Sequence, residues 1–282
     1  MSRLPVKKTY KLYIGGKFPR SESGRSYPAR DADGEVLARV ARASRKDVRD
    51  AVRTARGALE GWAGRSGYNR GQILYRIAET FEDRAGSFVD QLMDIGSTKR
   101  QAQAEVAASV DRLVWYAGWA DKFAQVYGNL NPVAGPFFNI SAPEPTGVVG
   151  VVAPEEPALE GLISRLAPVL VTGNTSVLLA SERFPMPAIT FTEVLDSSDV
   201  PAGVVNVLTG HKDELIPVLA DHMDVNAVDA GGATESQTVR IQEGAVHNVK
   251  RVVLPSADGP AQSPYRIAAF TEIKTVWHPK GL

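Results

Sequence analysis

Two adjacent glutamates, Glu155 and Glu156, stand between two prolines directly after the apolar, valine-rich run GVVGVVA at 147–153. The run has the composition of a buried strand, and α/β enzymes place their reactive groups at the carboxyl ends of such strands. Two neighbouring carboxylates can serve as a general acid and a general base. The plainer interpretation is a solvated loop, which we favour because no motif places another reactive group beside them.

Other residue types that carry chemistry are absent or scattered. The sequence contains 0 cysteines, which excludes disulfides, thiolate metal sites and a cysteine nucleophile. No two histidines are spaced three or four residues apart, so we predict no metal ligands among His211, His222, His247 and His278. Gly231 and Gly232 favour either a nest of backbone amides for an anion or a tight turn between strand and helix.

The overall composition is that of a soluble globular protein, with 282 residues, 44% of them hydrophobic and 23% charged. Lys and Arg number 32, as do Asp and Glu, so the formal net charge is +0 and nothing favours binding to nucleic acid or an anionic membrane. No apolar run reaches the roughly 20 residues of a membrane-spanning helix. The first residues lack the apolar core of a secretory signal, so we expect a cytoplasmic protein.

The N-terminal half of the chain is expected to supply strands and helices that pack around the strand end where Glu155 and Glu156 stand. Residues 9–40 predict short antiparallel strands, with a hairpin turn at Gly15-Gly16. Ser44 is expected to cap a helix, and a helical period extends over 70–126, including one long helix at 104–123. Residues 127–146 are rich in Gly and Pro and predict a protruding hairpin.

From residue 147 onward, strand and helix patterns alternate. This rhythm predicts an α/β fold, a doubly wound, Rossmann-like parallel sheet with an N-terminal helical layer, a protruding hairpin and a C-terminal strand. The segments that follow from this interpretation are the N-terminal hairpin and helices (1–126), the protruding hairpin (127–146), the Rossmann-like core (147–256), a linker (257–264) and the C-terminal strand (265–282).

Several segments, read in order, resemble the aldehyde dehydrogenase superfamily. They are YIGGKF at 13–18, EPTGVVGVVAP at 144–154, LAPVLVTGNTSVLLASE at 166–182, PAGVVNVLTG at 201–210 and FTEIKTVW at 270–277. The resemblance covers nearly the whole chain. It implies a nucleotide-binding Rossmann-like domain, NAD as the family's cofactor, and oligomerisation through the hairpin and the C-terminal strand.

The same resemblance implies that the catalytic groups are missing. Glu155 aligns with the asparagine that stabilises the oxyanion in the family, and a carboxylate there would repel that charge. Pro255 aligns with the general-base glutamate. The family's catalytic domain, with its cysteine nucleophile, lies between the last strand of the nucleotide-binding half and the C-terminal strand, where this chain has a short linker. The expected set of catalytic residues is therefore empty.

The resemblance also assigns cofactor residues. Glu182 matches the glutamate that binds the adenosine ribose, while Leu179 replaces the accompanying lysine. Gly231 and Gly232 match the turn that meets the pyrophosphate. With Glu182, Gly231 and Gly232 as the cofactor-binding residues, we expect that NAD is not required and that any NAD binding is weak.

Two functions of different classes follow. The first is a catalytically inactive subunit that assembles with a full-length aldehyde dehydrogenase through the hairpin and the C-terminal strand, with a homodimer as the other assembly. The alternative is an NAD-binding sensor or a residual NAD-dependent oxidoreductase. A different enzyme built on Glu155 and Glu156 is a third hypothesis, for which the sequence names no substrate.

Overall fold

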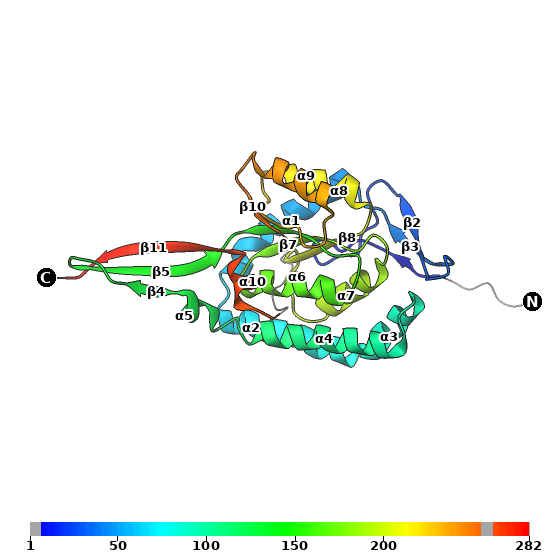
Figure 1. Ribbon diagram of the computed structural model, residues 1–282, viewed down its shortest axis with the longest axis horizontal. Helices are drawn as coiled ribbons and strands as arrows, with labels where there is room; N and C mark the ends of the chain where they lie inside the picture. The colour runs from blue at the N-terminus through cyan, green and yellow to red at the C-terminus, as the bar shows by residue number, and fades with distance from the viewer. Residues whose placement is uncertain (1–6, 255–261, 282) are drawn as a thin grey trace, which may run out of the picture.

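A five-stranded parallel sheet forms the centre of the protein in a computed structural model that describes residues 7–254 and 262–281 (Figure 1). The strand order is β10-β9-β6-β7-β8, and every neighbouring pair is parallel. The strands are β6 (Val148–Val152), β7 (Thr175–Leu179), β8 (Val205–Leu208), β9 (Ala227–Asp229) and β10 (Arg251–Val253). The chain adds strands first on one side of β6 and then on the other, which confirms the predicted doubly wound fold.

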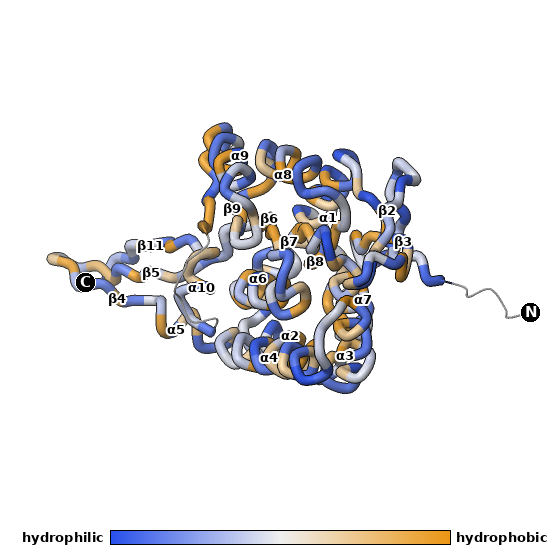
Figure 2. Tube along the Cα trace, turned by 45° about the vertical axis from the view of Figure 1, so that its right-hand side comes forward, coloured by the Kyte–Doolittle hydropathy of each residue, from blue (hydrophilic) through white to orange (hydrophobic). Residues whose placement is uncertain are grey.

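Helices cover both faces of this sheet (Figures 1 and 2). One face carries α1 (Arg45–Ala63), α8 (Lys212–Asp221) and α9 (Glu235–Ala245). The other carries α6 (Glu160–Val171) and α7 (Met186–Asp196), and α2 (Gly67–Asp83), α3 (Ala85–Asp94) and α4 (Lys99–Ala117) pack outside these two. Val149 and Val151 of β6 pack in the core on the face covered by α6 and α7, while Val148 and Val152 pack in the core on the face covered by α1 and α8. Burial on both faces explains why β6 is apolar at every position.

Local capping signals mark the starts of α1 and α4. Ser44 caps α1 as predicted and forms a capping box with Asp47. Thr98 and Gln101 form a second capping box, so α4 begins at Lys99 and ends before Gly118. The prediction of one helix over 104–123 is therefore wrong in both bounds, and α5 (Phe123–Tyr127) is a separate short helix.

The N-terminal strands only partly follow the prediction. β2 (Ser26–Arg30) and β3 (Val36–Ala41) are antiparallel as expected, and Gly15 and Gly16 turn with φ of 61° and 70°. However, β1 (Thr9–Tyr10) pairs in parallel with β3. The intervening chain first runs along the edge of β8, where Tyr13 bridges Val207, so β1 and β3 are not the two arms of a hairpin.

A second sheet, which we call the arm, projects from the body (Figure 1). It consists of β4 (Asn129–Asn131), β5 (Phe137–Pro145) and β11 (Thr271–Pro279), antiparallel and in the order β11-β5-β4. The predicted protruding hairpin is confirmed, and the C-terminal strand pairs with it along its whole length. Both β11 and β4 are edges of the arm.

The segment before β11 contains a helix that the sequence did not predict. α10 (Pro264–Ala268) begins after the cap Ser263, within the residues predicted as a linker and a C-terminal strand. Most of that linker, 257–261, lies outside the described residues, as does Pro255. Ile267 of α10 and Phe270, two residues after the end of the helix, are buried, so this segment belongs to the core rather than to a connection.

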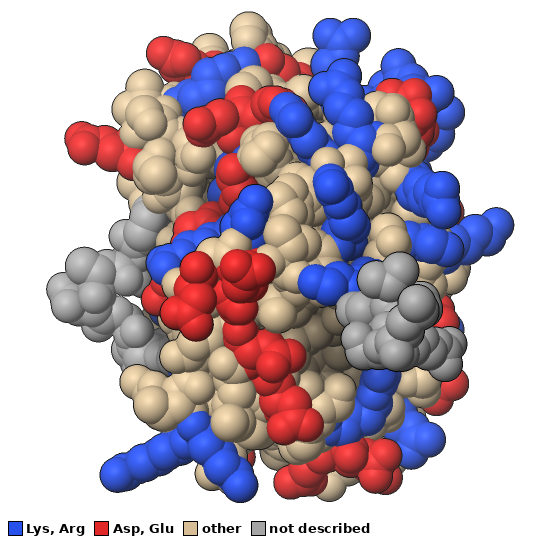
Figure 3. All heavy atoms as spheres, turned by 90° about the vertical axis from the view of Figure 1, so that its right-hand side faces the viewer, with Lys and Arg blue, Asp and Glu red and all other residues tan. Residues whose placement is uncertain are grey.

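The described helices include none that is both long and apolar enough to cross a membrane. Acidic and basic side chains are interspersed on the end of the molecule that carries β2 and β3 (Figure 3). This face therefore shows no broad patch of one sign of charge.

Candidate functional site

A cleft of about 620 Å³ opens at the carboxyl ends of the central strands. Glu155 follows β6, Glu182 follows β7 and His211 follows β8, and all three line the cleft together with Tyr27 of β2. The carboxyl ends of parallel strands meet at one edge of a sheet, so residues far apart in the sequence gather there. This is the location that the sequence predicted for Glu155 and Glu182.

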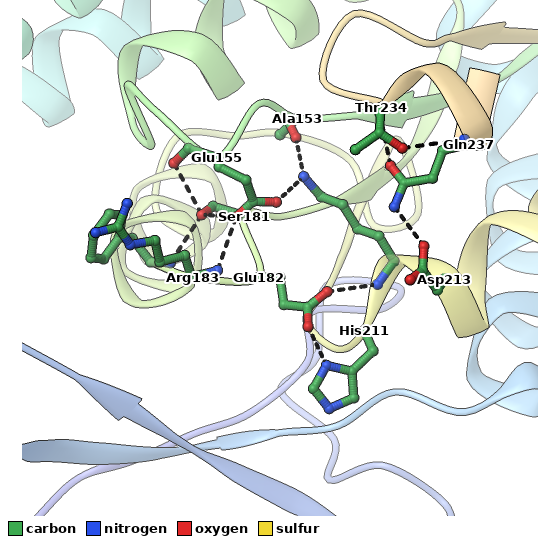
Figure 4. Close-up of polar contacts among 11 residues, drawn as sticks. Ala153, Glu155, Ser181, Glu182, Arg183, His211, Asp213, Thr234 and Gln237 are labelled. Atoms are coloured by element: carbon green, nitrogen blue, oxygen red, sulfur yellow. Dashed lines mark hydrogen bonds and ion pairs between the residues drawn. The ribbon is translucent and has the colours of Figure 1, made fainter. Parts of the chain in front are cut away.

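Lys212 is the central cation of this site, and the sequence analysis missed it. It is the first residue of α8, is only 3% exposed, and donates from its ammonium group to the carbonyl oxygen of Ala153 at 2.6 Å. The same ammonium pairs with Glu155 (Figure 4). A lysine in the first turn of a helix opposes the helix dipole, which was the available signal that it needs a partner.

The side chain of Glu155 is 41% exposed, but hydrogen bonds within the chain hold its carboxylate in place. One of its carboxylate oxygens accepts from the Ser181 hydroxyl at 2.8 Å and from the Arg183 amide at 2.9 Å (Figure 4). Burial disfavours the charged form, but these hydrogen bonds and that from Lys212 outweigh it and hold the pKa of Glu155 below its ordinary value. The carboxylate stays ionised at neutral pH, where a general acid must be protonated.

Glu156 has a different environment. Its side chain is 58% exposed and pairs with the exposed guanidinium of Arg183. The two neighbouring carboxylates thus turn to two different cations rather than toward a common reacting atom. The geometry gives the acid–base hypothesis no support. The interpretation as a solvated loop fits Glu156, whereas Glu155 is partly exposed and fixed by its contacts with Lys212, Ser181 and Arg183.

Both carboxylate oxygens of Glu182 are engaged within the chain. One accepts from the backbone amide of Lys212 at 3.0 Å, and the other contacts Nδ1 of His211 (Figure 4). His211 also lies beside Tyr27, with ring centroids 5.5 Å apart, so this histidine is more than a solvent-facing residue. Within the described ranges, no three histidine, aspartate or glutamate side chains converge as a metal site would require.

Gly231 and Gly232 lie at the end of β9, outside the residues that line the cleft. The amide of Gly231 donates to Asp229 at 2.8 Å, and that of Gly232 donates to the carbonyl of Val152 at 3.0 Å. A Cβ on Gly232 would stand 2.2 Å from the backbone carbon of Ala153. The glycines thus allow close packing of strand ends, and an anion could use these amides only by replacing existing hydrogen bonds.

The residues at the predicted nucleotide-binding positions already have partners within the chain. The ammonium of Lys212 lies across the end of β6, and the carboxylate of Glu182 is already paired. Leu179 is 1% exposed and packs in the core, so its side chain is not available to contact a ligand. The binding of NAD by Glu182, Gly231 and Gly232 remains a prediction, and we derive no chemical step through that cofactor.

Known proteins that are similar to this chain match nearly all of it, but the matched region is only about half of each of the two relatives described next. The model of the aldehyde dehydrogenase family matches residues 20–274. Retinal dehydrogenase 2 of Gallus gallus is 33% identical over 258 residues, which cover 89% of this chain and 49% of that protein. Benzaldehyde dehydrogenase, mitochondrial, of Antirrhinum majus is 33% identical over 256 residues, or 89% of this chain and 47% of that protein. The chain spans about half the length of the curated relatives it matches.

Solved structures give the same result. The NAD+ complex of aldehyde dehydrogenase from Bacillus cereus superposes with a TM-score of 0.82 at 26% identity and covers 88% of this chain and 50% of its own. HpcC from Thermus thermophilus superposes with a TM-score of 0.82 at 30% identity, covering 88% of this chain and 48% of its own.

Proposed function

Because this chain belongs to the aldehyde dehydrogenase family, whose members are NAD-dependent oxidoreductases, we propose that it is a catalytically inactive member that acts in the cytoplasm by assembling with a full-length aldehyde dehydrogenase. The observation that carries the proposal is the cysteine count of 0, since the family attacks its aldehyde with a cysteine thiolate. The pairing of Glu155 with Lys212 supports it, because a fixed carboxylate stands beside the strand end where an oxyanion would need hydrogen-bond donors.

The arm supports the assembly part of the proposal. Its register places Leu130, Ile140 and Val276 opposite one another across β4, β5 and β11. These side chains are 66%, 48% and 52% exposed, so an apolar row crosses one face of a projecting sheet. Exposed apolar groups in a continuous row are typical of a protein interface. A homodimer through the same surface is the other assembly that this row could serve.

Catalytic inactivity has a direct test. The purified chain, incubated with NAD and a panel of aliphatic and aromatic aldehydes, is expected to produce no NADH above the buffer rate, because no thiolate can form the covalent intermediate. NADH absorbance at saturating NAD is the measurement, with a full-length relative as the positive control. Sustained turnover by the purified chain would rule out an inactive subunit.

The alternative function, an NAD-binding sensor or residual oxidoreductase, is supported by the intact parallel sheet, by the position of Glu182 in the cleft and by Gly231 at the end of β9. Calorimetric titration with NAD is expected to give a dissociation constant of about 1 mM or weaker, since Leu179 lacks a charge-assisted contact of the kind that contributes about 1.5–3 kcal/mol. NADH serves as the second ligand in the same experiment. Micromolar affinity for either nucleotide would favour the sensor over the inactive subunit.

A further inference from the structure

A second cavity, of about 320 Å³, lies between α6, α10 and the ends of β9 and β10; we call it the α10 cavity. Among the described residues, none lines both this cavity and the cleft. Its walls are mostly apolar and include Pro168, Val253 and Phe270. Its volume is at the lower end of the roughly 300–1,000 Å³ found for small-molecule sites. The α10 cavity therefore has the size and lining of a binding site for a small ligand.

Arg165 of α6 brings an incompletely paired cation into these apolar walls. Its side chain is 15% exposed, and one guanidinium nitrogen donates to Asp229 at 3.1 Å. Within the part of the chain that the structure describes, Asp229 is the only hydrogen-bond partner of this guanidinium, which has five N–H donors. Arg165 lines the cavity, and none of its nitrogens is among the fully buried atoms that lack a partner, so the donors that Asp229 does not use are accessible.

The surroundings hold Arg165 in this position. Asp229 is 2% exposed, and burial raises the pKa of its carboxyl while Arg165 acts in the opposite direction. A Cβ on Gly231 would stand 1.9 Å from Cζ of Arg165, so the guanidinium occupies space that only glycine leaves open. Arg266 of α10 also lines the cavity.

We propose that the α10 cavity binds a small molecule that carries one carboxylate and an apolar tail. The carboxylate would accept hydrogen bonds from the spare donors of Arg165, a pairing that guanidinium geometry favours. The tail would lie against Pro168, Val253 and Phe270. This site is separate from the assembly role and does not depend on it.

Three probes of matched size or charge test the ligand class by calorimetric titration of the full chain. Hexanoate has both features, hexanol has the tail without the charge, and acetate has the charge without the tail. Hexanoate is expected to bind at least ten-fold more tightly than hexanol or acetate. Equal binding of hexanoate and hexanol, or no binding of hexanoate at millimolar concentration, overturns the proposal.

Two variants test the residues. Asp229→Asn removes the carboxylate that competes for Arg165, so hexanoate is expected to bind several-fold more tightly than to the unaltered chain. The double variant Arg165→Met with Asp229→Asn leaves no lone buried charge and is expected to lose the preference for hexanoate over hexanol. Arg240→Met, which breaks the surface pair between Arg240 of α9 and Asp221 of α8, is the control and should change neither affinity. If the single and double variants bind hexanoate equally well, Arg165 is not the ligand-binding group.

Discussion

Thr275→Pro is expected to abolish co-purification of the chain with a full-length aldehyde dehydrogenase. At the two ends of β11, the amide of Thr146 donates to the carbonyl of Phe270 and the amide of Lys280 donates to the carbonyl of Pro136. In this antiparallel register the even-numbered residues of β11 therefore direct their backbone N–H and C=O groups toward β5. The alternation directs the N–H groups of Ile273, Thr275 and Trp277 to the free edge of the arm. Proline at 275 removes one of these donors and blocks strand addition, and edge strands tolerate proline.

Thr275→Ala is the matched control, because it removes the same side chain and its contact with Ser141 but keeps the N–H group. The readout is native mass and the identity of co-purifying chains in cells that express each tagged variant. Deleting 265–282 would be a poorer test, since it also removes the buried Ile267 and Phe270. Retention of the partner by the proline variant would contradict assembly through this edge.

Glu155→Gln is expected to lower the free energy of unfolding by about 2 kcal/mol, because it leaves the ammonium of Lys212 without its carboxylate. The loss is below the roughly 3–5 kcal/mol of a fully buried pair, since solvent still reaches the carboxylate. Glu156→Gln is the control, and as an exposed pair it should change stability by about 0.5 kcal/mol or less. Urea unfolding compares the two variants, and equal effects would contradict the importance of the Lys212 pair.

The stability difference between the unaltered chain and Glu155→Gln is expected to depend on pH in one direction. The pKa of Glu155 is lowered in the folded protein, so its contribution is complete above the unfolded value of about 4.3 and is lost as pH falls through the folded value. The stability advantage of the unaltered chain over Glu155→Gln should therefore disappear in acid. Adding Lys212→Met to Glu155→Gln should recover most of the lost stability at neutral pH, because no unpaired ammonium remains.

The central sheet could be predicted because its signals are local. Five apolar segments alternate with helical periods, and Ser44 marks a helix start by its own side chain. The pairing of β1 with β3 could not be predicted, because it depends on the path of residues 11–35, which connect the two strands. α10 was missed although Ser263 and Pro264 are a start signal, since five residues carry too little periodicity to indicate a helix.

The sequence predicted where the cleft residues Glu155 and Glu182 lie, but not the side chains that they contact. Glu155 and Glu182 were assigned to the carboxyl edge of the sheet, where the structure puts both. Lys212 was missed because its contact with Glu155 joins residues 57 positions apart, and nothing near Lys212 in the sequence names that partner. Arg165 was missed for the same reason: it meets Asp229 across 64 positions and appears in the sequence only as one charged residue in an apolar helix.

The pairing of β11 with β5 also fixes when the arm can form during synthesis. Ser141 and Thr275 bond across 134 positions, and Asn174 bonds the carbonyl of Phe270 across 96. Contacts this distant in sequence form slowly and cannot form before their second member leaves the ribosome. Until residue 279 has emerged, β5 has only β4 beside it and the nascent arm is a two-stranded ribbon. A translation product interrupted before β11 would lack the outer strand, and with it the edge on which the proposed assembly depends.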